Sequence, residues 1–303
     1  MNRLAHIWVI FAAIALVSCD KTTEPAYLHI ESVELEVEPD FSQGTNAHGI
    51  RDAWVYLNDR LVGIYELPAT VPIISEGEQK ITILGGVLKN GIQTARITYP
   101  FYQQYVTNLD LKPGVTIDFS GSSGATTQKN GHSVPVLRYF ETGLVFWNER
   151  FEDAGVQFEA TAESQANMSI TQNPAQVYNH DPANQSTGSG IVVLEGNNRY
   201  FEVRSTFSFP QIAPGTEIYL ELNYHTACTL QVGVYQDTPF ETKVYGKGIR
   251  PNNQWSKIYI DLTPEVRGST NGSSFSIFIE GILDNGQNFG EVFIDNVKLV
   301  YPG

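Results

Sequence analysis

The chain has 303 residues and a formal net charge of −14, which comes from 33 acidic and 19 basic side chains. This acidic balance argues against nucleic acid and against anionic lipid surfaces as partners, because both are bound through basic patches. Aromatic residues are plentiful, charged residues are few, and short alternating runs are separated by glycine, asparagine, threonine and serine. No long stretch has the apolar period of a helix, so the sequence predicts an all-β protein.

An uncharged apolar run lies near the N-terminus, directly before a cysteine. Residues 7–17 follow the basic Arg3 and lead to Cys19. A membrane-spanning helix needs roughly 20 apolar residues, so this run is too short to cross a bilayer. Its length and the small Ser18 before the cysteine are typical of a signal peptide, which we place at residues 1–18.

The four residues Leu-Val-Ser-Cys that end at Cys19 resemble the lipobox of bacterial lipoproteins. The resemblance implies that the Cys19 thiol is lipidated and that its acyl chains hold the mature protein on a membrane. Residues 19–26 are short and polar, and they indicate a solvated tether. Their charged pair, Asp20-Lys21, resembles the export signals of Bacteroidota surface lipoproteins, which implies an outer-membrane anchor and a protein facing the periplasm or the cell surface. An ordinary secretory signal with an incidental cysteine is the alternative.

Residues 27–119 form the first predicted domain, and Asn58-Asp59 marks a tight hairpin within it. The predicted strands span residues 28–37, 53–57, 61–67, 79–84, 93–99 and 115–119. The order of Ala-Trp-Val-Tyr-Leu, Leu-Val-Gly and Leu-Pro along residues 53–68 resembles PEGA-type and related Ig-like modules. The resemblance implies a small β-sandwich that acts as a spacer or an interaction platform.

Residues 120–142 begin with a small, polar run that is rich in glycine and serine, which predicts a flexible linker. Residues 143–303 then form the second predicted domain, whose regular strand spacing favours a double-sheet jelly roll. Its predicted strands span residues 191–194, 200–205, 217–226, 230–235, 255–262, 275–281 and 290–301. Cys228 lies within this domain and has no partner for a disulfide if Cys19 carries lipid, so we expect a buried thiol.

Three segments of the second domain resemble strands of galactose-binding-like and carbohydrate-binding jelly rolls. They are Asn-Glu-Arg-Phe-Glu-Asp at residues 148–153, Gln-Trp-Ser-Lys-Ile-Tyr-Ile-Asp-Leu at 254–262, and Val-Phe-Ile-Asp-Asn-Val-Lys-Leu at 292–299. The resemblance implies that Glu152 and Asp295 share a structural Ca²⁺, an ion that prefers several oxygen ligands. In the alternative, Asp295 caps a turn and Glu152 faces water.

A ligand-binding face follows from strand alternation, which places every second side chain on the same side of a sheet. If the strands around residues 200, 219 and 235 are neighbours, their polar sides combine into one surface with aromatic rings, carboxylates and amides. The predicted face consists of Tyr200, Glu202, Arg204, Tyr219, Glu221, Asn223, His225 and Tyr235. Such a surface suits a sugar, whereas a solvated outer sheet is the plainer interpretation.

No catalytic signature is present in the sequence. It has neither a His-Glu-x-x-His motif nor a Gly-x-Ser-x-Gly elbow, and no glycine loop for phosphate. We therefore expect a non-enzymatic, membrane-anchored surface lipoprotein whose jelly roll recognises a glycan or a protein partner. The alternative is a structural accessory subunit of an outer-membrane import, secretion or assembly complex.

Overall fold

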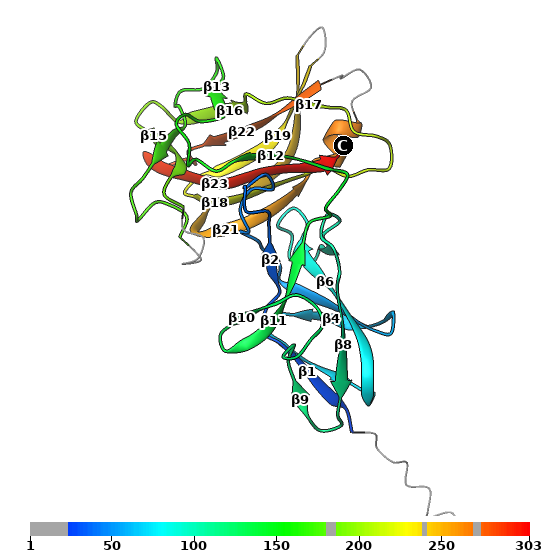
Figure 1. The fold of residues 1–303 in the computed structure, drawn as a ribbon. Helices are drawn as coiled ribbons and strands as arrows, with labels where there is room; N and C mark the ends of the chain where they lie inside the picture. Colours follow the sequence, from blue (N-terminus) through cyan, green and yellow to red (C-terminus); the bar gives the residue numbers. More distant parts are fainter. Residues whose placement is uncertain (1–23, 180–185, 238–240, 269–273) are drawn as a thin grey trace, which may run out of the picture.

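The computed structural model describes residues 24–179, 186–237, 241–268 and 274–303, and strands dominate these ranges (Figure 1). The predicted all-β fold is confirmed, with one short helix, α2 (Thr263–Arg267), among the described residues. In this part of the chain no helix is long and apolar enough to cross a membrane. The predicted signal peptide and Cys19 lie outside the described residues.

Residues 26–139 form the N-terminal domain, which is the lower half of Figure 1. Its strands are β1 (Ala26–Ile30), β2 (Glu34–Glu36), β3 (Asp52–Leu57), β4 (Arg60–Glu66), β5 (Ala69–Ile73), β6 (Gly77–Leu88), β7 (Arg96–Thr98), β8 (Tyr105–Leu111), β9 (Thr116–Ile117), β10 (Thr126–Lys129) and β11 (His132–Arg138). They make a five-stranded sheet, β4-β3-β6-β7 with β8 on β6, and two small sheets, β5-β1-β9 and β10-β11-β2. The predicted hairpin is confirmed, since Asn58 and Asp59 join β3 to β4 with φ angles of 49° and 66°.

The predicted linker over residues 120–142 is wrong, because this segment belongs to the N-terminal domain. β10 and β11 form a hairpin, and β11 also pairs in parallel with β2. Leu137 and Tyr139 are buried in the domain core. The serine-rich start of the segment is also bound: Ser122 Oγ lies 2.6 Å from Thr107 Oγ1, and the Ser123 N–H donates to the same oxygen at 3.1 Å. Small polar residues here form a fixed turn through their hydroxyls and do not act as a spacer.

Residues 144–302 form the C-terminal domain, a sandwich of two sheets. Its strands are β12 (Leu144–Glu149), β13 (Phe158–Ala160), β14 (Ser169–Thr171), β15 (Ser189–Glu195), β16 (Tyr200–Ser205), β17 (Phe209–Pro210), β18 (Tyr219–Thr226), β19 (Thr229–Asp237), β20 (Thr242–Ile249), β21 (Asn252–Asp261), β22 (Ser274–Ile282) and β23 (Phe289–Pro302). We call β14-β15-β23-β18-β21, with β12 on β23, the interface sheet, and β13-β16-β22-β19-β20, with β17 on β22, the outer sheet.

The core of the C-terminal domain lies between these two sheets. Leu220 and Leu222 of β18 point into it from the interface sheet, and Phe201 and Val203 of β16 point into it from the outer sheet. Cys228 is fully buried in the same core as a free thiol, as predicted, and burial raises the pKa of this thiol to about 11. It therefore acts as a small apolar side chain.

The far side of the interface sheet is buried against the N-terminal domain. Tyr219, Tyr259 and Val300 pack with the aromatic side chains of the N-terminal core instead of with the core of their own domain. The ring of Tyr99 lies edge-on to Tyr219 and Tyr259, with centroids 5.3 and 4.9 Å apart. The core of the N-terminal domain thus extends onto the interface sheet, which packs the two domains against each other.

A fully buried carboxylate, Glu221, lies at the centre of this contact. Its Oε1 accepts hydrogen bonds of 2.8 Å from both Tyr99 and Tyr139, and its Oε2 lies 3.3 Å from the Lys257 ammonium. Lys298 donates in turn to the Tyr139 hydroxyl at 2.9 Å. Burial alone would raise the pKa of Glu221, but the two lysines and the two hydroxyl donors outweigh it, so the pKa is lowered.

We predict that Glu221→Gln strongly destabilises the whole chain. The amide would leave Lys257 and Lys298 buried without their counter-charge, and breaking a buried pair in this way costs about 3–5 kcal/mol. Urea unfolding, followed by tryptophan fluorescence, measures the effect, and Glu195→Gln at an exposed position is the matched control. Equal midpoints for the two variants would contradict this account of the interface.

Candidate functional site

The residues of the predicted ligand face divide between the two sheets. Tyr200, Glu202 and Arg204 lie on β16 and Tyr235 on β19, both in the outer sheet, where β22 separates the two strands. β18 pairs instead with β21 and β23 of the interface sheet. The prediction of one combined face is therefore wrong, although the alternation within each strand is as predicted. The residues that fall on β18 are Tyr219, Glu221, Asn223 and His225.

The outer-sheet residues form a group that is already bonded internally. The Glu202 carboxylate is buried, and it accepts hydrogen bonds from Tyr200, Tyr235 and Lys243. Lys243 also pairs with Glu280. Burial raises the pKa of Glu202, but these three donors outweigh it and bring the pKa to about 2. Because the charges satisfy one another, this group stabilises the sheet more than it offers free polar atoms to a ligand.

Arg204 lies at the edge of this group, beside a surface depression of about 630 Å³. Its guanidinium pairs with Glu241 and stacks over Tyr235, 4.8 Å from the ring centroid. The Glu241 carboxylate and the Tyr235 ring thus hold the Arg204 guanidinium in place. Like the other charged side chains of this group, Arg204 is already engaged by its neighbours.

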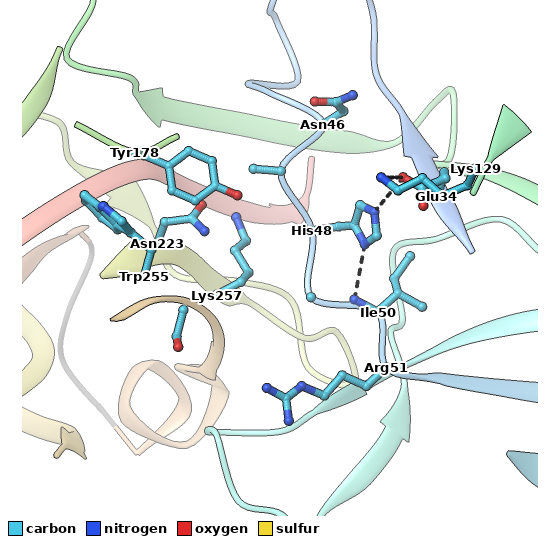
Figure 2. Close-up of a pocket in the computed structure, with 13 residues that line it drawn as sticks. Glu34, Asn46, His48, Ile50, Arg51, Lys129, Tyr178, Asn223, Trp255 and Lys257 are labelled. Carbon is cyan, nitrogen blue, oxygen red and sulfur yellow. Dashed lines mark hydrogen bonds and ion pairs between the residues drawn. The ribbon is translucent and has the colours of Figure 1, made fainter. Parts of the chain in front are cut away.

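Asn223 of β18 lines a separate site, a pocket between the two domains (Figure 2). Its volume is about 590 Å³. The N-terminal domain contributes the segment before β3 and parts of β2 and β10, and the C-terminal domain contributes β18, β21 and Tyr178. The lining residues are Glu34, Asn46, Ala47, His48, Gly49, Ile50, Arg51, Lys129, Tyr178, Asn223, Trp255, Ser256 and Lys257.

Two aromatic rings lie together on the C-terminal wall of this pocket. Trp255 and Tyr178 meet edge to face with centroids 5.5 Å apart, and His225 lies behind Trp255 at 6.1 Å. The Trp255 ring is partly exposed at this edge of the interface sheet. Burial lowers the pKa of His225, which favours its neutral form. The wall therefore presents apolar ring surface beside polar groups.

Two buried polar atoms in this pocket, Oδ1 of Asn46 and Oδ1 of Asn223, have no hydrogen-bond partner among the described residues. Nζ of Lys257 also lines the pocket and is paired with the Glu221 carboxylate at 3.3 Å. Asn223 and Lys257 are almost fully buried, and Figure 2 shows both side chains directed toward Tyr178. A buried polar atom without a partner costs about 1–3 kcal/mol, so such atoms in a pocket mark a place where a polar ligand would gain.

Positive charge predominates on the pocket wall, although the whole chain is acidic. Arg51, Lys129 and Lys257 line it together with the single carboxylate of Glu34. Glu34 is itself held by His48 at 3.4 Å and by the Ser32 hydroxyl at 2.7 Å. The His48 contact, the largest cause, lowers the pKa of Glu34 to about 2 against the effect of burial. The pocket thus favours an anionic group over a cationic one.

The two predicted calcium ligands lie on either side of residues 186–189. Glu152 accepts hydrogen bonds from the Thr187 and Gly188 N–H groups, and Asp295 accepts from Ser189 Oγ and from the Asn296 N–H. Each carboxylate thus accepts hydrogen bonds from the chain, and an ionised carboxylate has about four lone-pair sites, so further partners can still be bound. The calcium ion stays a prediction.

Comparisons with known proteins were made against family models, curated sequences and solved structures. No family model and no curated sequence matches the chain. The enzymatically active domain of tailspike protein 4 of bacteriophage CBA120 is similar in structure, at 10% identity and a TM-score of 0.34 over 52% of this chain. The chain spans 19% of that tailspike chain.

A family 29 carbohydrate-binding module, CBM29-2, is also similar, at 11% identity and a TM-score of 0.34, over 52% of this chain and 85% of the module. Its complex with cellulohexaose gives the same identity and TM-score, over 53% of this chain and 93% of the module. With TM-scores this low, function has to be argued from the residues of this chain.

We predict that the stability of the folded chain falls as the pH rises from about 5 to 7, partly through Asp295. Burial raises the pKa of Asp295 to about 7, despite its hydrogen bonds. The folded state therefore keeps a proton that the unfolded state, with an ordinary carboxyl pKa, has lost, so raising the pH favours unfolding. Urea titrations at several pH values measure the free energy of unfolding. In Asp295→Asn, the part of its decrease with pH that comes from Asp295 should disappear. Identical slopes in both proteins would refute the assignment.

The same titrations repeated with millimolar Ca²⁺ and with a chelator test the calcium prediction. If the ion is bound, the unfolding midpoint of the natural protein should be higher with Ca²⁺ than with the chelator, because a ligand of the folded state shifts unfolding by mass action, and that of Asp295→Asn should not change. Equal midpoints of the natural protein in both solutions would refute the calcium prediction.

Proposed function

We propose that the protein is a non-catalytic glycan-binding protein and that its ligand is an acidic glycan held in the pocket between the two domains. The observation that carries the proposal is that the amide oxygens of Asn46 and Asn223 have no hydrogen-bond partner among the described residues and line one pocket with the Lys257 ammonium and the rings of Trp255 and Tyr178. Sugar hydroxyls can both donate and accept, so they can satisfy an amide oxygen and an ammonium at once. Aromatic faces provide the apolar contact for a sugar ring.

The charge of the pocket supports the acidic character of the glycan. Arg51 is exposed at the rim, and Glu34, the one carboxylate among the lining residues, is already engaged by His48, Ser32 and Lys129. An arginine can bind a sugar carboxylate through two parallel hydrogen bonds. In a chain with a net charge of −14, such a local excess of positive groups is the feature that would select this ligand.

We further propose that the protein is lipidated on Cys19 and anchored in an outer membrane of the Bacteroidota type. The support is the lipobox-like sequence with its apolar run and its charged pair after the cysteine. The described chain starts directly after the polar tether, and Figure 1 places β1 at the end of the N-terminal domain that is remote from the C-terminal domain. The tether would therefore hold the protein upright, with the pocket away from the membrane.

Glycan binding is tested with the full chain in detergent micelles, using an immobilised oligouronate as the probe. Retention is expected for the natural protein, and a loss of about tenfold or more for Trp255→Ala and for Asn223→Ala. Tyr235→Ala on the outer sheet is the matched control and should be retained. Neutral glucose and mannose hexasaccharides should bind more weakly, and added salt should weaken the oligouronate contact.

Two outcomes would count against the pocket. Loss of retention in Tyr235→Ala alone would move the site to the outer sheet. No retention of any glycan, together with a membrane protein that co-purifies in mild detergent, would favour the accessory-subunit function instead.

Cys19→Ser tests the lipid anchor separately. We expect the natural chain to sediment with outer membranes and to incorporate labelled palmitate, because two or three acyl chains give stable attachment. The variant should appear in the soluble fraction without label. A variant that still sediments with the membrane after a high-salt wash would contradict the proposed anchor.

A further inference from the structure

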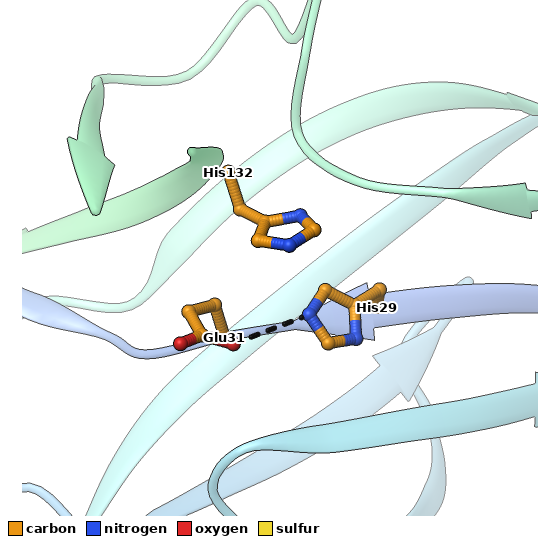
Figure 3. A group of neighbouring side chains, drawn as sticks. All are labelled: His29, Glu31 and His132. Atoms are coloured by element: carbon orange, nitrogen blue, oxygen red, sulfur yellow. Dashed lines mark ion pairs between the residues drawn. The ribbon is translucent and has the colours of Figure 1, made fainter. Parts of the chain in front are cut away.

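Two histidines and a glutamate come together in the N-terminal domain, beside the β10–β11 hairpin (Figure 3). His29 lies on β1, Glu31 follows that strand, and His132 begins β11. Their nearest nitrogen and oxygen atoms all lie within 4.8 Å of one another. Because β1 and β11 belong to different small sheets, this cluster lies where the two sheets meet.

The geometry of the cluster is close to that of a metal site. Nε2 of His29 lies 3.4 Å from Oε2 of Glu31, near the separation of about 3.3 Å between two ligands of a tetrahedral zinc ion. This Nε2 atom is buried, and its contact among the described residues is the ion pair with Glu31. The His132 ring lies over the His29 ring with centroids 4.5 Å apart and a tilt of 53°. A small rotation of the His132 side chain would bring the third ligand into range.

The surrounding residues hold the ligands in the orientation that a metal needs. Nδ1 of His29 lies 3.2 Å from the Thr70 hydroxyl, which leaves Nε2 for the ion. Oε1 of Glu31 accepts a hydrogen bond of 2.7 Å from Asn130, which leaves Oε2. Ligands that are oriented by a second set of hydrogen bonds are characteristic of protein metal sites.

His132 has an orienting group as well. Its Nδ1 lies 3.8 Å from Oδ2 of Asp118, a carboxylate that the Ser133 N–H holds at 3.3 Å. A surface depression of about 540 Å³, lined by both histidines and Asp118, opens beside the cluster. An ion can therefore enter from solvent, and a water molecule can complete its coordination.

We propose that His29, Glu31 and His132 bind a divalent transition metal ion of the zinc class. Two imidazoles and one carboxylate form a donor set that suits zinc, copper and nickel and discriminates against calcium and magnesium, which prefer oxygen ligands alone. The bound ion joins β1, the strand next to the tether, to the β10–β11 hairpin. None of these three ligands lines the glycan pocket, although Lys129 of the pocket wall pairs with His132 across the hairpin.

The test is titration of the chelator-treated full chain with Zn²⁺ alone, followed by calorimetry and by thermal unfolding. We expect one ion to bind per chain and the unfolding temperature to rise with zinc. His132→Gln should weaken binding by about tenfold or more, because losing even an orienting group costs 10–100-fold at such sites. Mg²⁺ should leave the unfolding temperature of the natural protein unchanged.

His48→Gln is the matched control, because His48 also pairs with a carboxylate at 3.4 Å but lines the pocket between the two domains. It should bind zinc as the natural protein does. Asp118→Asn should bind zinc with lower affinity and keep the fold, which separates an effect on the ligand from an effect on stability. Equal zinc affinity in the natural protein and in His132→Gln would overturn the proposal, as would no binding at all.

Discussion

The buried ionic contact of Glu221 with Lys257 and Lys298 is the constraint on which the domain arrangement depends. These charged groups lie between two β domains and are removed from water, which costs desolvation free energy. Their mutual attraction offsets this cost only while every partner is in place. The hydroxyls of Tyr99 and Tyr139 come from the N-terminal domain and complete the set. A relative rotation of the domains would separate donors from acceptors, which is why the pocket beside them keeps a defined shape.

The burial that fixes the domains also creates the proposed binding site. Lys257 contacts Glu221 on one side and lines the pocket on the other. Burial lowers the pKa of Lys257, and the neighbouring carboxylate opposes this effect. An anionic ligand in the pocket would add a second negative partner, so ligand binding and domain packing should reinforce each other.

Much of the fold could be predicted from sequence, because alternation and turn residues are local signals. Residues 200–205 and the Asn58-Asp59 hairpin are examples in which the observed strand or turn matches the predicted one. The same local signal failed at residues 120–142, where Pro135 and the serine-rich start concealed a paired strand. Register and pairing depend on distant residues, and a single sequence does not reveal them.

The candidate sites were harder to predict for the same reason. Alternation correctly placed Glu221 and Asn223 on one side of their strand, but nothing local indicated that another domain covers that side. Lys243 and Glu280 complete the Glu202 group. Lys243 lies on β20, which was not among the predicted strands, and Glu280 lies on β22, which was predicted as a strand but not assigned to this face. His29 and His132 are distant along the chain, and only the packing of two small sheets brings them together.

The late place of β23 in the chain order has a consequence for how the protein folds. This strand pairs with β12, β15 and β18, and it carries Lys298 and Val300 into the contact between the domains. Synthesis delivers the N-terminal domain first, with Tyr99, Tyr102 and Tyr139 still uncovered. This aromatic face stays exposed until β18, β21 and β23 have been made and paired, so the nascent chain needs protection from aggregation until then.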